Sequence, residues 1–175
     1  MEWRDLVVDG YRRVAGTLEE YLKGLTPQDM DQQPRPDSNS IGWLAWHTTR
    51  GQDSQIAALM GEPQLWISEG WHQKFGRPAD PKDTGFGHAP ADVAAFKSPP
   101  VETQLAYQRA VLARTERYLA SLTPDDLARQ LNEPWFQPLP TVGVRLVSIM
   151  ADNLQHVGQI GYARGLLKGK GWLPY

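Results

Sequence analysis

The chain has 175 residues, a length that suits one domain with a sizeable hydrophobic core. Its formal net charge is -2 and its basic residues form no cluster, which argues against nucleic acid and anionic membranes as partners. No stretch approaches the roughly 18 apolar residues of a membrane span, and the absence of cysteine excludes disulfides, thiolate ligands and a cysteine nucleophile. We expect one cytoplasmic domain over residues 1–175.

Two helices are predicted in the first third of the chain, and the first of them is amphipathic. Residues 2–23 repeat apolar side chains at helical spacing, and Gly24 follows as a C-terminal signal. A second helix is predicted at about residues 40–60, with Ser and Asn before it and Gly61 after it. Its middle, residues 48–55, holds no apolar side chain, so a helix that crosses the domain would bring polar groups inside, where they need partners.

The next segment, residues 61–100, is rich in Gly, Pro and aromatic side chains and leaves room only for short helical turns at 64–74 and 90–96. A connection this long is typical of a lid, a binding loop or a crossover. Further helices are predicted at about 100–121, 124–131 and 142–168. The pattern predicts an all-α four-helix bundle with a long irregular loop region between its second and third long helices.

One sequence echo supports this layout: YLKGLTPQDMDQQ from Tyr21 resembles YLASLTPDDLARQ from Tyr118. Each pattern indicates the end of a long helix, then a short helix with Thr26 or Thr123 as N-cap and proline at its first position. The echo suggests two similar helical halves.

Small residues form a stripe on the last predicted helix, although each interior glycine costs roughly 1 kcal/mol relative to alanine. Such a stripe implies close approach of another backbone. Packing within the bundle is the favoured interpretation, with a dimer contact or a ligand groove as alternatives. Its members are Ala151, Leu154, Gly158, Gly161 and Gly165.

Asp152 and His156 of the last helix are one turn apart, so both can reach one ligand. A third donor must come from another element, and His47, beside the polar middle of the second helix, is the obvious candidate. Two histidines and a carboxylate leave positions open for water or substrate, as in catalytic zinc and non-haem iron sites. An ion pair between Asp152 and His156 is the alternative.

Other residues accompany these three. Arg50 and Asp53 continue the His47 face and Gln159 continues the His156 face, as second-shell or substrate-binding groups together with Trp46, or as a buried polar network. His72 and His88 lie in the loop region, where solvated or cap-like roles are expected. Core packing is favoured for five tryptophans: Trp43, Trp46, Trp66, Trp71 and Trp135.

The sequence resembles the DinB/YfiT-like superfamily over nearly its whole length, and within it the actinobacterial type related to mycothiol-dependent maleylpyruvate isomerase. The resemblance is carried by SIGWLAWHTTRGQDSQIAAL, TGFGHAPADVAAF and TVGVRLVSIMADNLQHVGQIGYARGLL. It implies a four-helix bundle, often dimeric, with a divalent metal such as zinc or nickel held by His47, Asp152 and His156. Better-known members have Glu or His at the position of Asp152, and a shorter carboxylate is expected to weaken the site or change its metal.

Several members of that superfamily are S-transferases that use mycothiol, bacillithiol or glutathione. The resemblance therefore implies a small-molecule substrate and a low-molecular-weight thiol that the metal activates. It also implies that the protein can form a homodimer. Arg50 or Arg164 is a candidate partner for a substrate carboxylate. The alternatives are a metal-assisted hydrolase and a non-catalytic module that binds a small ligand.

Overall fold

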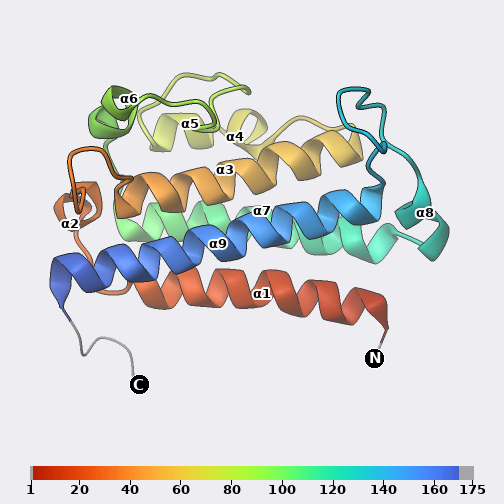
Figure 1. Cartoon of the computed structure of the whole chain (residues 1–175), viewed down its shortest axis with the longest axis horizontal. Helices are drawn as coiled ribbons and strands as arrows, with labels where there is room; N and C mark the ends of the chain where they lie inside the picture. Colours follow the sequence, from red (N-terminus) through yellow and green to blue (C-terminus); the bar gives the residue numbers. More distant parts are fainter. Residues whose placement is uncertain (1, 170–175) are drawn as a thin grey trace.

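Four long helices form the bundle in the computed structural model, which describes residues 2–169 (Figure 1). They are α1 (Trp3–Leu22), α3 (Ile41–Met60), α7 (Val101–Ser121) and α9 (Val142–Lys168). Short helices occupy the connections: α2 (Pro27–Asp31), α4 (Leu65–Ser68), α5 (Trp71–Lys74), α6 (Pro90–Ala95) and α8 (Pro124–Ala128). The described residues contain no strand, which confirms the predicted all-α bundle. None of these helices has both the length and the apolar character needed to cross a membrane.

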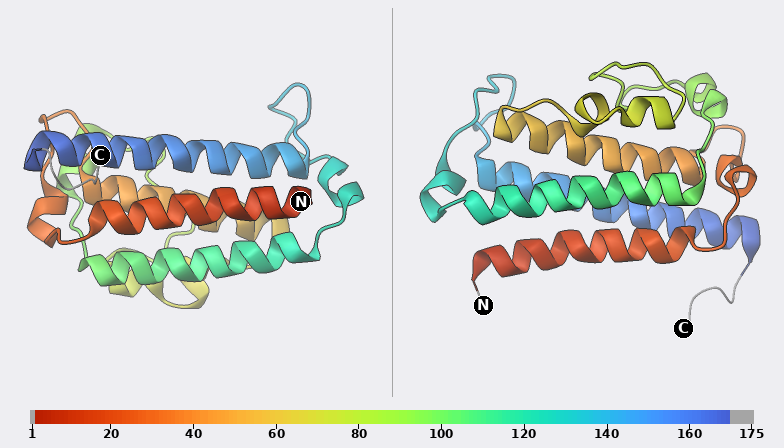
Figure 2. Two further views of the ribbon diagram at one scale, coloured as in Figure 1. Left: turned by 90° about the horizontal axis from the view of Figure 1, so that it is seen from below. Right: turned by 180° about the vertical axis from the view of Figure 1, so that it is seen from behind.

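The order of the helices explains the long loop region. Helix α1 contacts α7 and α9, and α3 contacts the same two helices, so α1 and α3 are diagonal to each other. Helices α3 and α7 run in the same direction (Figures 1 and 2). The chain between them must return along the length of a helix of 20 residues, roughly 30 Å. This return segment, residues 61–100, carries α4, α5 and α6 along the outer side of α3.

Helix α3 is largely buried because α7, α9 and the return segment surround it. Its threonine hydroxyls donate to carbonyl oxygens four residues earlier, and Gln52 bonds Thr115 of α7 and Asn153 of α9. These partners meet the hydrogen-bonding needs of groups removed from water. The polar middle of α3 is inside, as predicted, and its buried members are Thr48, Thr49, Arg50, Gln52 and Asp53.

The repeated Thr-Pro motif has the same structure in both places. Thr26 and Thr123 are N-caps whose hydroxyls accept a backbone N–H three residues later, and the aspartate there accepts the threonine N–H in return. Both predicted caps are confirmed. The predicted helix over 124–131 ends early, at Ala128, because the chain pairs with itself instead: Leu131 N–H donates to the carbonyl of Pro140. This pairing closes a loop that we call the 129–141 loop.

That loop also corrects one prediction about the tryptophans. Trp135 is 73% exposed in the 129–141 loop and contacts the ring of Phe136, so core packing was the wrong prediction for it. The proline-bounded stretch holds it outside the bundle. The other four tryptophans are buried, as predicted.

The glycine stripe of α9 meets two different environments. A Cβ on Gly161 would lie 2.6 Å from the ring of Tyr21, so this glycine permits close packing of α9 on α1, against a side chain rather than the expected backbone. A Cβ on Gly158 would meet no described atom within 4 Å. Gly158 instead lines a groove of about 710 Å³ between α9 and the segment before α3.

This contrast predicts opposite effects for two alanine substitutions. Gly158→Ala is expected to raise the free energy of unfolding by up to about 1 kcal/mol, because alanine has the higher helix propensity. Gly161→Ala is expected to lower it by about 1 kcal/mol or more, because the new methyl group presses on Tyr21. Urea denaturation measures both values. A stabilising Gly161→Ala would contradict the close packing of α1 on α9.

Candidate metal centre

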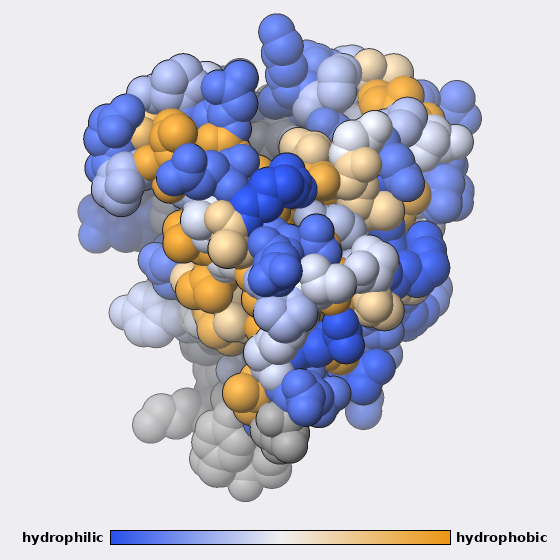
Figure 3. Space-filling model, turned by 90° about the vertical axis from the view of Figure 1, so that its right-hand side faces the viewer, coloured by the Kyte–Doolittle hydropathy of each residue, from blue (hydrophilic) through white to orange (hydrophobic). Residues whose placement is uncertain are grey.

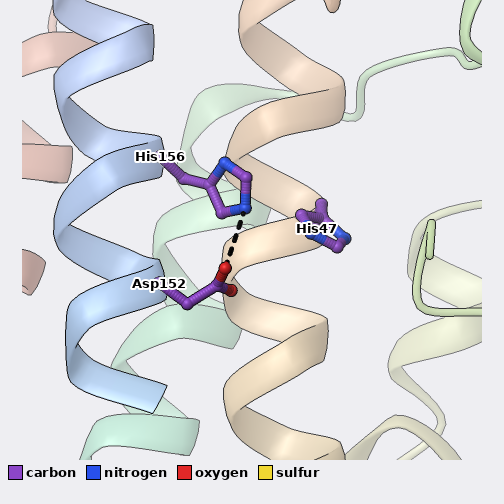
Figure 4. A group of neighbouring side chains, drawn as sticks. All are labelled: His47, Asp152 and His156. Carbon is purple, nitrogen blue, oxygen red and sulfur yellow. Dashed lines mark ion pairs between the residues drawn. The ribbon is translucent and has the colours of Figure 1, made fainter. Parts of the chain in front are cut away.

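His47 of α3 and Asp152 and His156 of α9 lie together where these two helices face each other (Figure 4). One potential ligand atom from each lies within 4.8 Å of the others. Nε2 of His156 is 3.5 Å from Oδ1 of Asp152, and the two imidazole centroids are 4.7 Å apart. The structure thus brings together the three residues selected from the sequence.

The side chain of Asp152 is more exposed than that of His156, its neighbour on α9. Its side chain is 49% exposed, against 15% for His156. The shorter carboxylate nevertheless reaches the histidines, because α9 packs directly on α3. Two imidazoles and a carboxylate are a donor set that zinc and other first-row divalent ions accept.

The hydrogen bonds of both histidines favour coordination of a metal through Nε2. The Nδ1–H of His47 donates to the carbonyl oxygen of Thr84 over 2.5 Å, and the Nδ1–H of His156 donates to Oε1 of Gln159 over 2.8 Å. Each bond leaves the Nε2 lone pair of that ring available for coordination. The donor chemistry of this site therefore fits a divalent cation.

Aromatic stacking holds the ring of His47. Trp43, one turn earlier on α3, lies 4.8 Å from it at an interplanar angle of 13°. The indole N–H of Trp43 donates to Nδ1 of His88, whose Nε2–H donates to Asp83. His88 thus supports the stack, whereas the sequence suggested a solvated or cap-like role. Burial is the main cause that lowers the pKa of His47, which favours the neutral, ligating form.

Arg50 contacts the return segment. Its Nε and Nη2 atoms donate to the carbonyl oxygens of Asp83 and Pro81, over 3.1 and 3.3 Å. These bonds fix the backbone just before Thr84, the residue that accepts from His47. Arg50 therefore acts on His47 only through the backbone at Thr84. Its own contacts belong to a buried polar network, which is one of the two roles predicted for it.

The other three residues predicted to surround the ligands differ in whether they contact a ligand. Gln159 contacts His156 directly, as a second-shell residue would. Asp53 belongs to the buried network, where it accepts from the first two backbone N–H groups of α4 and from the hydroxyl of Tyr107. Trp46 is buried among other aromatic rings. Of these three, Gln159 is the one whose hydrogen bond reaches a candidate ligand.

Arg164 has a different role from the one suggested by the sequence. It donates to the carbonyl oxygens of Tyr21 and Lys23, at the C-terminal end of α1, where orphan carbonyls need donors. The cleft beside the candidate ligands contains another arginine, Arg145. Neither Arg50 nor Arg164 is among the residues that line this cleft.

This cleft has a volume of about 480 Å³ and opens beside His47 and Asp152. In Figure 3 the end of the bundle that carries the 129–141 loop faces the viewer, and a hollow separates projections at its top. The cleft is lined by serine, glutamine and aromatic side chains from α3, α9, the return segment and the 129–141 loop. Among them are Ser54, Gln55, Phe86, Phe136 and Ser148.

A signal in the sequence could have identified Arg145. Arg145, Ser148, Asp152 and His156 follow one another at spacings of three and four residues, which places them on one face of α9. Thr84 left no comparable signal, because it contributes a backbone carbonyl that any residue could supply.

Comparisons with known proteins agree with the fold. A family model described as the DinB superfamily matches residues 11–160. A crystal structure of a conserved protein from Enterococcus faecalis is 32% identical, with a TM-score of 0.89, and the match covers 97% of this chain and 99% of that one. No curated protein matches the sequence.

Proposed function

The chain belongs to the DinB superfamily, and we propose that it is a divalent-metal-dependent enzyme in which His47, Asp152 and His156 hold the ion. The observation that carries the proposal is the convergence of three potential ligand atoms within 4.8 Å of one another. Hydrogen bonds from both Nδ1 atoms support it, since they favour coordination through Nε2. Zinc and nickel are the proposed ions.

The proposed reaction is transfer of a thiol of the mycothiol type to an electrophile, or a thiol-dependent isomerisation, as in the isomerase-related branch that the sequence resembles. A bound divalent ion would supply the Lewis acidity that favours thiolate over thiol at neutral pH. The chain has no cysteine, so the sulfur must come from a small molecule. The cleft of about 480 Å³ is within the size range of small-molecule sites.

The side chains around the site have separate tasks in this proposal. Thr84 and Gln159 fix the tautomers of the two histidines, and Trp43 restricts the ring of His47. Asp152 contributes the negative charge among the three ligands. Serine hydroxyls in the cleft, from Ser54 and Ser148, can bond the polar groups of a substrate.

Turnover with and without a thiol tests the proposal. Untagged protein loaded with zinc or nickel is incubated with a bimane halide, in the presence and absence of mycothiol. We expect conjugate to form above the uncatalysed rate only with both thiol and metal, and this activity should disappear on chelation. Consumption of an activated ester without thiol would instead favour a hydrolase. Metal binding without turnover, with mycothiol, bacillithiol or glutathione, would favour a ligand-binding module.

A further inference from the structure

Arg145 is a cation built into the wall of the cleft. Its side chain is 20% exposed, its Nη1–H donates to Gln55 Oε1 over 3.1 Å, and its Nη2 pairs with the carboxylate of Glu133. A guanidinium group has five N–H donors. These two bonds therefore leave donors that a ligand in the cleft can engage.

The charges around Arg145 favour one kind of anion. Glu133 already contacts the guanidinium and offsets its positive charge, so a ligand with two negative charges would meet one cationic side chain with a fixed carboxylate beside it. A single carboxylate can form the planar, bidentate pair that guanidinium favours. The site therefore suits a monocarboxylate better than a phosphate dianion.

Two exposed phenylalanines line the cleft from separate segments. Phe86 of the return segment is 93% exposed, and Phe136 of the 129–141 loop is 50% exposed. Exposed apolar side chains gathered at one cleft are typical of a ligand-binding surface. An apolar group of a ligand that covers these rings would remove apolar surface from water, which favours binding.

We propose that the cleft binds a small molecule with one carboxylate, which pairs with Arg145, and one aromatic or other apolar group, which packs against Phe86 and Phe136. The inference rests on the proposed function, because it names the substrate class of the same site. Glu133 also affects binding in this proposal. This residue competes with the ligand carboxylate for Arg145, so its neutralisation should strengthen binding.

The test measures binding of 3-phenylpropionate and its uncharged amide to zinc-loaded protein by isothermal titration calorimetry. Arg145→Gln should weaken binding of the carboxylate about tenfold, through loss of a charge-assisted pair, and leave binding of the amide unchanged. Glu133→Gln should strengthen binding of the carboxylate severalfold. The matched control is Arg12→Gln, which removes an exposed arginine paired with Glu116 and should change neither affinity.

The opposite signs separate recognition from a structural role. If Arg145 only anchors the 129–141 loop, both Arg145→Gln and Glu133→Gln should weaken binding, and that result overturns the inference. Binding that is the same in both variants and is lost when zinc is removed also overturns the inference, because the carboxylate would then bind the metal alone. Glu133→Gln keeps the test decisive if Arg145→Gln fails to fold.

Zinc content measured on the same samples distinguishes this inference from the proposed function. Protein that takes up no zinc and still binds 3-phenylpropionate through Arg145 would support the inference and contradict the metal-dependent function. Protein with full zinc content and no dependence on Arg145 or Glu133 would overturn the inference and leave the metal site intact.

Discussion

Zinc affinity is expected to fall by at least about 100-fold in His156→Ala, more than the loss of an outer-shell partner usually costs. The substitution leaves His47 and Asp152, two donors where a catalytic zinc site uses three from the protein. His47→Ala should have an effect of the same size, because it removes the donor from the other helix. Competition with a chromogenic chelator measures the affinities.

His72→Ala is the matched control for these variants. His72 lies on α5 and contacts the ring of Trp66, outside the candidate site. Its replacement should leave zinc affinity within about threefold of the original, since it neither coordinates nor orients a ligand. Equal zinc affinity in His72→Ala and His156→Ala would place the bound ion elsewhere on the protein.

The free energy of unfolding is expected to fall by about 3–5 kcal/mol in Asp53→Ala. Asp53 is fully buried, and its carboxylate accepts from the backbone N–H groups of Leu65 and Trp66 and from the hydroxyl of Tyr107. Arg50 lies 3.6 Å from the same carboxylate. The substitution leaves these buried donors and a buried positive charge without their acceptor.

Asp9→Asn provides the comparison for Asp53→Ala. Asp9 pairs with Arg13 on the exposed face of α1, where water screens the interaction, so this change should cost less than about 1 kcal/mol. Urea denaturation of both variants measures the difference. Similar losses would show that the buried network around Asp53 does not anchor the return segment to α3.

The sequence was most informative where structure depends on neighbours along the chain. Helix α9 begins and ends where periodicity placed it, and Thr26 and Thr123 form caps through bonds to residues three positions later. Asp152 and His156 are close for the same local reason, because one helical turn separates them. Such features need no knowledge of the rest of the fold.

His47 was predictable for a less direct reason. Its distance from α9 depends on tertiary packing, yet the polar middle of α3 already indicated that unusual groups enter the bundle. For Arg50 the same indication left two interpretations open, and the structure places it in the buried polar network. It lies only three residues beyond His47, but because α3 is surrounded, its side chain bonds the return segment at Pro81 and Asp83.

Contacts made by loops could not be predicted from residue pattern. The acceptor for His47 is the backbone oxygen of Thr84, whose position depends on how the return segment crosses α3. Trp135 is of a residue type that is usually buried, and only the closed 129–141 loop explains its exposure. The pairing of Arg145 with Glu133 likewise depends on where that loop folds back on α9.

Elemental analysis of untagged protein, after dialysis against metal-free buffer, decides whether His47, Asp152 and His156 hold a metal ion. We expect one divalent ion per chain in the unmodified protein and none in either His47→Ala or His156→Ala. Metal-free protein that takes up no zinc or nickel, and whose melting temperature ignores chelator, would contradict it.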